Sequence, residues 1–219
     1  SCAKSLVEGI QYYNENPEDK IGLMYPDIGG YGTKDIEFVM GFDIDVRKVN
    51  KPLAEALRAA PNCSMNHVNT IHTNGDSNSS CVKSKAMVYS APELDGIAPH
   101  MHDYPDEVTF VNGAIPAESF DRTVELIKYH DVDVLINYLP VGSEDATKYW
   151  IDVAIKAGVN FVNCIPTLIS TDDAMETEQR FIDAGLTIVG SDMRSAWGAS
   201  RMSEVLQLSL IHISEPTRP

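Results

Sequence analysis

The sequence has 219 residues, is 43% hydrophobic and carries a formal net charge of −15. A chain of this length buries one sizeable core, and without a run of about 18 apolar residues no membrane-spanning helix is expected. The strong negative charge argues against the phosphate backbone of nucleic acid as a partner. These properties predict a globular protein with neither a membrane nor a nucleic acid as its partner.

The cysteines and histidines do not predict a metal centre. The four cysteines are dispersed along the chain, without a CxxC motif or a cysteine/histidine cluster at zinc spacing. His100 and His102 stand close together, but no third ligand lies near them in the sequence. We therefore expect reduced thiols, no metal, and a cytoplasmic location.

The first half of the chain mixes helix patterns with long irregular stretches. Residues 3–15 place Leu6, Val7, Ile10 and Tyr13 on one face of a predicted helix. The further elements expected here are a Gly/Pro-rich loop at 16–34, a buried strand at 35–45 that ends in acids, a helix at 50–60 with Pro52 in its first turn, an exposed loop at 61–85, a short strand at 86–90 and a helix at 116–131 that starts at Pro116.

The second half alternates strands and helices more clearly. The pattern predicts strands at 132–138, 159–164 and 186–190, with helices at 143–157 and 172–184 that end at Gly158 and Gly185. Strands that alternate with helices at this spacing indicate βαβ units and a parallel sheet, and their apolar character is typical of a sheet covered on both faces. The predicted fold class is α/β, a Rossmann-like doubly wound parallel sheet.

The strand that ends in "FVMGFDID" suggests a nucleotide site. A carboxylate at the end of such a strand, here Asp43, accepts two hydrogen bonds from an adenosine ribose and favours NAD over NADP. The alternative is an aspartate that only caps the following turn. A glycine-rich phosphate motif would precede Ser1, so we expect the fold to be truncated at its beginning.

The stretch "NYLPVGSE", at 137–144, follows the next long strand. In a doubly wound sheet the ligand lies beyond the carboxyl ends of the strands, where this turn would stand. Pro140 and Gly142 would keep the turn open, and Ser143 would cap the helix while leaving N–H groups to face a ligand. The alternative is a well-capped turn without any ligand.

Several stretches together resemble the inositol-3-phosphate synthase family, in its shorter prokaryotic branch. They are "SCAKSLVEGI", "DIEFVMGFDIDVRKVNKPLAEAL", "LDGIAPHM", "VDVLINYLPVGSEDATKYW", "AIKAGVNFVNCIPTLIS" and "AGLTIVGSDMRSAWGAS". The resemblance covers most of residues 1–207 and is to the N-terminal, NAD-binding part of the family. The catalytic domain would be largely missing from this chain.

The resemblance implies an NAD-dependent isomerisation of D-glucose 6-phosphate to 1D-myo-inositol 3-phosphate, in which the cofactor takes a hydride and returns it. It also implies a homo-tetramer for the full-length protein. Because the active site would be incomplete, we expect this chain to be inactive alone. The alternatives are a non-catalytic NAD-binding module or another NAD-dependent oxidoreductase.

Site residues carry over by position from the resemblance. The residues implied to bind the cofactor are Ser1, Cys2 and Ala3 at the phosphate loop, Asp43 and Asp45 at the ribose, Asn137, Leu139, Pro140, Val141, Gly142 and Ser143 along the dinucleotide, and Asn163, Cys164, Ile165 and Pro166 towards the nicotinamide. The implied catalytic residues are Asp192 and Arg194.

The sequence departs from the family near its end. Where the family has Gly-Asp-Asp-x-Lys-Ser-Gln, this chain has serine at 191, arginine at 194 and alanine at 196. Arginine does not release its proton as a tuned lysine does, so a proton-transfer role at Arg194 would be lost. Residues 1–207 are predicted to form one NAD-binding domain, and residues 208–219 a non-native tail that resembles translated adapter sequence.

Overall fold

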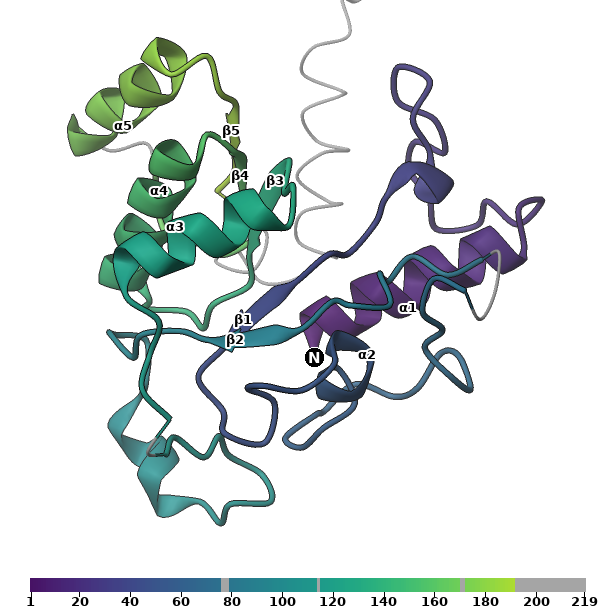
Figure 1. Cartoon of the computed structure of the whole chain (residues 1–219), viewed down its shortest axis with the longest axis horizontal. Helices are drawn as coiled ribbons and strands as arrows, with labels where there is room; N and C mark the ends of the chain where they lie inside the picture. Colours follow the sequence, from purple (N-terminus) through teal and green to yellow (C-terminus); the bar gives the residue numbers. More distant parts are fainter. Residues whose placement is uncertain (76–78, 114, 170–171, 192–219) are drawn as a thin grey trace, which may run out of the picture. The chain divides into compact units, whose positions relative to one another are not determined.

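The computed structural model describes residues 1–75, 79–113, 115–169 and 172–191. It divides into two compact units. Unit 1 comprises Ser1–Glu93 and Ala98–Val132, and unit 2 comprises Leu94–Ile97 and the chain from Asp133 onward. Figure 1 traces the elements in chain order. The predicted single domain over 1–207 remains a prediction, as does the non-native tail, which lies outside the described residues.

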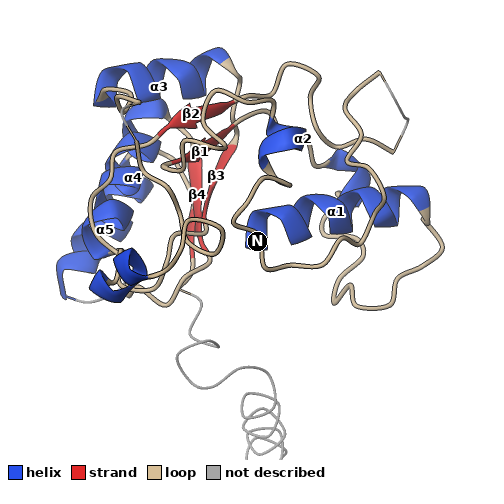
Figure 2. Cartoon of the chain, turned by 90° about the horizontal axis from the view of Figure 1, so that it is seen from below, coloured by secondary structure: helices blue, strands red, loops and turns tan. Residues whose placement is uncertain are grey.

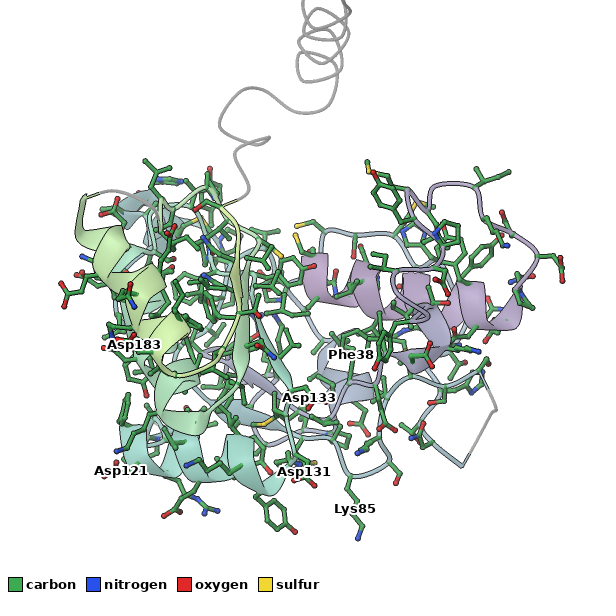
Figure 3. All side chains as sticks on the ribbon, turned by 90° about the horizontal axis from the view of Figure 1, so that it is seen from above. Phe38, Lys85, Asp121, Asp131, Asp133 and Asp183 are labelled. Atoms are coloured by element: carbon green, nitrogen blue, oxygen red, sulfur yellow. The ribbon has the colours of Figure 1, made fainter. Side chains whose placement is uncertain are left out.

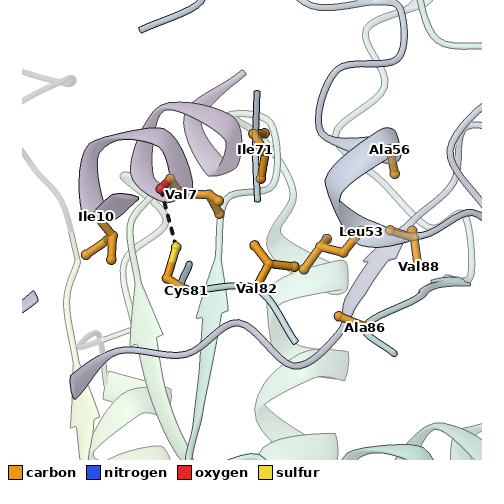
Figure 4. Close-up of a cluster of buried hydrophobic side chains, with 9 residues drawn as sticks. All are labelled: Val7, Ile10, Leu53, Ala56, Ile71, Cys81, Val82, Ala86 and Val88. Atoms are coloured by element: carbon orange, nitrogen blue, oxygen red, sulfur yellow. Dashed lines mark hydrogen bonds between the residues drawn. The ribbon is translucent and has the colours of Figure 1, made fainter. Parts of the chain in front are cut away.

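Unit 1 is built around a short parallel strand pair. Strand β1 (Gly41–Asp43) pairs with β2 (Val88–Ser90), and Asp43 stands opposite Ser90. Helix α1 (Cys2–Glu15), the short helix α2 (Leu53–Ala56), and helix α3 (Phe120–Tyr129) complete the unit, with 3-10 turns η1 (Thr33–Asp35) and η2 (Pro99–Asp103). Figure 4 shows the buried cluster formed by Val7, Ile10, Leu53, Ala56, Ile71, Cys81, Val82, Ala86 and Val88.

Helix α1 buries polar side chains that the apolar pattern did not reveal. Lys4, Glu8 and Gln11 are at most 3% exposed. The Lys4 ammonium donates to the carbonyls of Ser64 and Met65, and the Glu8 and Gln11 side chains accept from backbone N–H groups of the same loop. An irregular segment has no ladder to satisfy its backbone, so these side chains do so instead.

The expectation of an exposed loop at 61–85 is therefore wrong in part. The segment is irregular, as predicted, but Ile71, Cys81 and Val82 are at most 6% exposed and belong to the core. The Cys81 thiol lies 3.5 Å from the Val7 carbonyl oxygen, and burial raises the pKa of this thiol to about 11. A loop without periodicity can still bury side chains where a helix covers it.

Three element boundaries also differ from prediction. The strand expected at 35–45 is paired regularly only over Gly41–Asp43, and the helix expected at 50–60 is regular over Leu53–Ala56. Helix α3 begins at Phe120 rather than at Pro116, because the Ser119 hydroxyl accepts a hydrogen bond from the Arg122 N–H and caps it. The short strand predicted at 86–90 is confirmed as β2.

Unit 2 confirms the predicted strand–helix alternation. Strand β3 (Val134–Asn137), helix α4 (Glu144–Ala157), strand β4 (Asn160–Asn163), helix α5 (Asp172–Asp183) and strand β5 (Ile188–Val189) follow one another, and the strands form a parallel sheet in the order β3-β4-β5. Figures 1 and 2 show α4 and α5 on the same side of these strands. Gly158 ends α4 with φ +80°, as predicted.

Within the described residues, the sheet of unit 2 is not covered on both faces along β3. Val134 and Ile136 are 44% and 37% exposed, whereas Phe161 of β4 is fully buried. The α/β class with parallel strands is confirmed, and within the described residues its ladders form two separate sheets.

Candidate functional site

Two asparagines end neighbouring strands of unit 2 and bond to each other. Asn137 and Asn163 are register partners in β3 and β4, and they are 4% and 2% exposed. The Asn137 Nδ2 donates to Asn163 Oδ1 at 2.9 Å and to Thr147 Oγ1 at 3.2 Å. The Asn137 Oδ1 accepts from the Leu139 N–H at 3.0 Å. The predicted residues Asn137, Leu139 and Asn163 thus meet at the carboxyl edge of the sheet.

This buried network positions the turn that follows β3. The Asn137 amide uses its oxygen and nitrogen on protein groups and so fixes the chain direction at Leu139. Asn163 does the same after β4, where its Nδ2 donates to the carbonyls of Ile165 and Thr167. The parts of the turn that face solvent are Tyr138, Pro140, Val141 and Gly142.

The N-terminus of α4 is capped differently from the prediction. Ser143 makes no side-chain cap within the described part of the chain. The Asp95 carboxylate accepts instead from the N–H groups of Asp145 at 2.7 Å and Ala146 at 2.9 Å. Burial alone would raise the pKa of Asp95, but hydrogen bonds from the Ala146, Asp145 and Glu144 amides outweigh it and lower the pKa.

Gly96 fits tightly over Ser143. Its φ is +82°, and a Cβ built there would lie 1.9 Å from the Ser143 Oγ. The Ser143 side chain is fully buried, and its Oγ has no hydrogen-bond partner among the described residues. The segment Leu94–Ile97 therefore acts as part of the site, although the sequence pattern assigned it no function. The one indication in the sequence was "LDG", an acid followed by glycine in an irregular stretch, which is typical of a turn.

The two acids at the end of β1, Asp43 and Asp45, have separate environments. The Asp45 side chain is 1% exposed and accepts from the Arg47 guanidinium and N–H and from the Val111 N–H. Although burial opposes it, the Arg47 and Val111 hydrogen bonds lower the pKa of Asp45. The Asp43 side chain is 32% exposed, lies 3.4 Å from the Lys48 ammonium, and accepts from the Asp45 N–H.

That Asp45 holds a ribose stays a prediction, and in this structure its carboxylate has protein partners. Its carboxylate is saturated by Arg47 and Val111 and is closed to solvent, so it ties the segment near residue 111 to the end of β1. Asp43 keeps an accessible carboxylate at the end of the strand, where the sequence pattern placed the ribose ligand.

The remaining predicted residues have less distinctive surroundings. Ser1, Cys2 and Ala3 are exposed at the start of α1, and the Ser1 hydroxyl accepts from the Cys63 N–H. Cys164 and Pro166 follow β4, and the Cys164 N–H donates to the Asn137 carbonyl at 3.1 Å. The predicted catalytic residues Asp192 and Arg194 lie outside the described residues.

Ser191, which stands in place of the family's first acid, has a structural environment. Its hydroxyl donates to the Thr167 carbonyl at 2.5 Å and accepts from the Ile169 N–H at 3.1 Å. These bonds join the end of β5 to the loop after β4. A serine here supplies both a donor and an acceptor, which an ionised acid does not.

Among the described residues, no three histidine, cysteine, aspartate or glutamate side chains gather as a metal-binding group. No helix in the same part of the chain combines the length and apolarity needed to cross a bilayer.

Parallel strands joined by helical crossovers, with polar groups at the carboxyl ends of the strands, define an α/β protein in which a ligand is expected beyond those ends. The chain is 39% identical to the inositol-3-phosphate synthase of Corynebacterium glutamicum over 208 residues, which are 94% of this chain and 52% of that protein. It is 38% identical over the same share to the enzyme of that name from Mycolicibacterium smegmatis. No protein-family model matches the chain.

A solved structure supports the fold. The myo-inositol-1-phosphate synthase-related protein from Thermotoga maritima aligns with a TM-score of 0.67 at 18% identity, covering 96% of this chain and 56% of that one. The chain is thus homologous to inositol-3-phosphate synthases along nearly all of its length, which confirms the resemblance predicted from the sequence. It spans about half the length of the curated relatives it matches.

Proposed function

We propose that this chain is the NAD-binding part of an inositol-3-phosphate synthase that isomerises D-glucose 6-phosphate in the cytoplasm, as a homo-tetramer when full length. The observation that carries the proposal is the 39% identity over 94% of the chain to a relative of that name. The shared segment includes the strand ending at Asp43 and the turn after Asn137.

The groups that support this proposal lie within each unit separately. In unit 1, the accessible Asp43 carboxylate suits the two hydroxyls of an adenosine ribose. In unit 2, the network of Asn137, Thr147 and Asn163 holds an exposed turn that the resemblance assigns to the cofactor. When bound, NAD supplies hydride acceptance and return; the protein residues orient it.

Replacing Asp43 with asparagine should weaken NAD binding about tenfold with little loss of stability. Asparagine retains an oxygen for the Asp45 N–H but removes the charge and one acceptor for the ribose. Isothermal titration of NAD into the purified chain measures the effect. Asp121→Asn, at an exposed carboxylate of α3 labelled in Figure 3, is the matched control and should leave the affinity unchanged. Equal affinities for Asp43→Asn and the unaltered chain would remove Asp43 from the site.

The reaction requires a separate measurement. The 219-residue chain, given NAD and glucose 6-phosphate, should make no inositol phosphate, because the chain spans about half of its relatives. Inositol phosphate made by this chain would contradict that expectation. Net accumulation of NADH with a sugar phosphate would instead favour another NAD-dependent oxidoreductase, since an isomerisation returns the hydride.

A further inference from the structure

The first-turn N–H groups of α4 are already occupied by a protein carboxylate. Asp95 accepts from Asp145 at 2.7 Å and from Ala146 at 2.9 Å. Exposed amides at the start of a helix are the groups that commonly bind phosphate. A phosphate at this helix would therefore have to displace Asp95.

The residue after Asp95, Gly96, packs closely against Ser143 at the start of α4. Gly96 has φ +82° and lies so close to Ser143 that a Cβ would reach within 1.9 Å of the Ser143 Oγ. The Ser143 hydroxyl, which would ordinarily cap the helix, is fully buried beneath Gly96. It has no hydrogen-bond partner in the described part of the chain. The helix cap thus comes from a residue distant in sequence.

The local charge also opposes an anion. Glu144 and Asp145 are exposed in the first turn of α4, beside the Asp95 carboxylate. Lys148 lies 3.8 Å from Asp145, but both side chains are more than 70% exposed, so this pair compensates little. These three carboxylates repel a phosphate at the helix start and so oppose the attraction of the helix dipole.

We infer that Asp95 is a specificity-determining residue of the turn after β3: it closes the N-terminus of α4 to phosphate, so that the turn contacts a part of the dinucleotide other than its pyrophosphate. This inference rests on the proposed function. The turn itself fits such a ligand, because Tyr138 and Val141 are 38% and 73% exposed and residues 138–142 carry no charge.

Amide NMR spectra of the full chain test the inference with inorganic pyrophosphate as the probe. In the unaltered chain, pyrophosphate should leave the Asp145 and Ala146 amides unshifted. In Asp95→Ala those amides become free, and pyrophosphate should bind them about tenfold more tightly. Asp133→Asn, which removes one charge just before β3 (Figure 3), is the matched control and should behave like the unaltered chain.

The outcomes separate cleanly. Equal shifts of Asp145 and Ala146 in the unaltered chain and in Asp95→Ala would overturn the inference, as would a folded Asp95→Ala that does not bind pyrophosphate. If Asp95→Ala does not fold, Asp95→Asn decides: it keeps a cap without the charge and should bind pyrophosphate more tightly than the unaltered chain, and equal binding overturns the inference. NAD added to the unaltered chain should shift the Val141 and Gly142 amides. Failure to bind NAD refutes the proposed function. The comparison of pyrophosphate binding between the unaltered chain and the Asp95 variants still tests the role of Asp95 by itself.

Discussion

Replacing Gly96 with alanine is expected to destabilise unit 2 by roughly 3 kcal/mol. The added Cβ would lie 1.9 Å from the Ser143 Oγ and 3.2 Å from its Cα, and the left-handed backbone at φ +82° adds strain. Because Trp150 of α4 is only 7% exposed, its fluorescence during urea unfolding reports on this unit. The measurement is made in a Trp197→Phe background, which leaves Trp150 as the remaining tryptophan.

Gly142 provides a matched control for the Gly96 variant. Its φ is +94°, and a Cβ there meets no atom within 4 Å, so Gly142→Ala carries only the backbone strain of about 1–2 kcal/mol. Ser143→Ala removes a buried hydroxyl without a partner among the described residues and should cost little; combined with Gly96→Ala it should recover part of the lost stability. Equal losses for Gly96→Ala and Gly142→Ala would show that the close approach of Gly96 to Ser143 is unimportant.

Local sequence patterns predicted which helices and strands form better than they predicted how long each one is. The helix at 144–157 and its end at Gly158 follow from periodicity and from glycine's access to positive φ, both of which depend on neighbouring residues. The extent of β1 does not follow in this way. Residues 35–40 are apolar enough for a strand, but regular pairing depends on β2, which lies more than 40 residues further along the chain.

The candidate site was also predictable only where it depends on local sequence patterns. The sequence located the turn after Asn137 and the acids at the end of β1, because strand ends are visible in the pattern. It did not show that Asp45 is buried, since its burial depends on the Val111 N–H, 66 residues away. It also missed Asp95, whose amide donors lie 50 and 51 residues further on. Partners so distant in sequence are fixed only by the tertiary fold.

Replacing Asn137 with leucine should destabilise unit 2 by about 3–5 kcal/mol. The change leaves the Leu139 N–H and the Asn163 Oδ1 without their partner at a position that is 4% exposed, and each buried orphan costs about 1–3 kcal/mol. Urea unfolding followed through Trp150 measures the loss. Asn160→Leu, at the other end of β4, is the control: the Asn160 side-chain hydrogen bonds are exposed and water replaces them, so it should cost less than about 1 kcal/mol.

Asn137→Asp tests whether the network itself, rather than side-chain volume, is responsible. The carboxylate would keep the bond from the Leu139 N–H but face the Asn163 Oδ1 as an acceptor against an acceptor. Burial raises the pKa of such an acid above its unfolded value of about 3.9, so the unfolded chain releases the proton first and stability falls as pH rises. The variant's deficit should therefore be small near about pH 4 and grow towards neutrality, where a deprotonated acid cannot donate to Asn163. A deficit independent of pH would mean that the contact between Asn137 and Asn163 does not hold the turn.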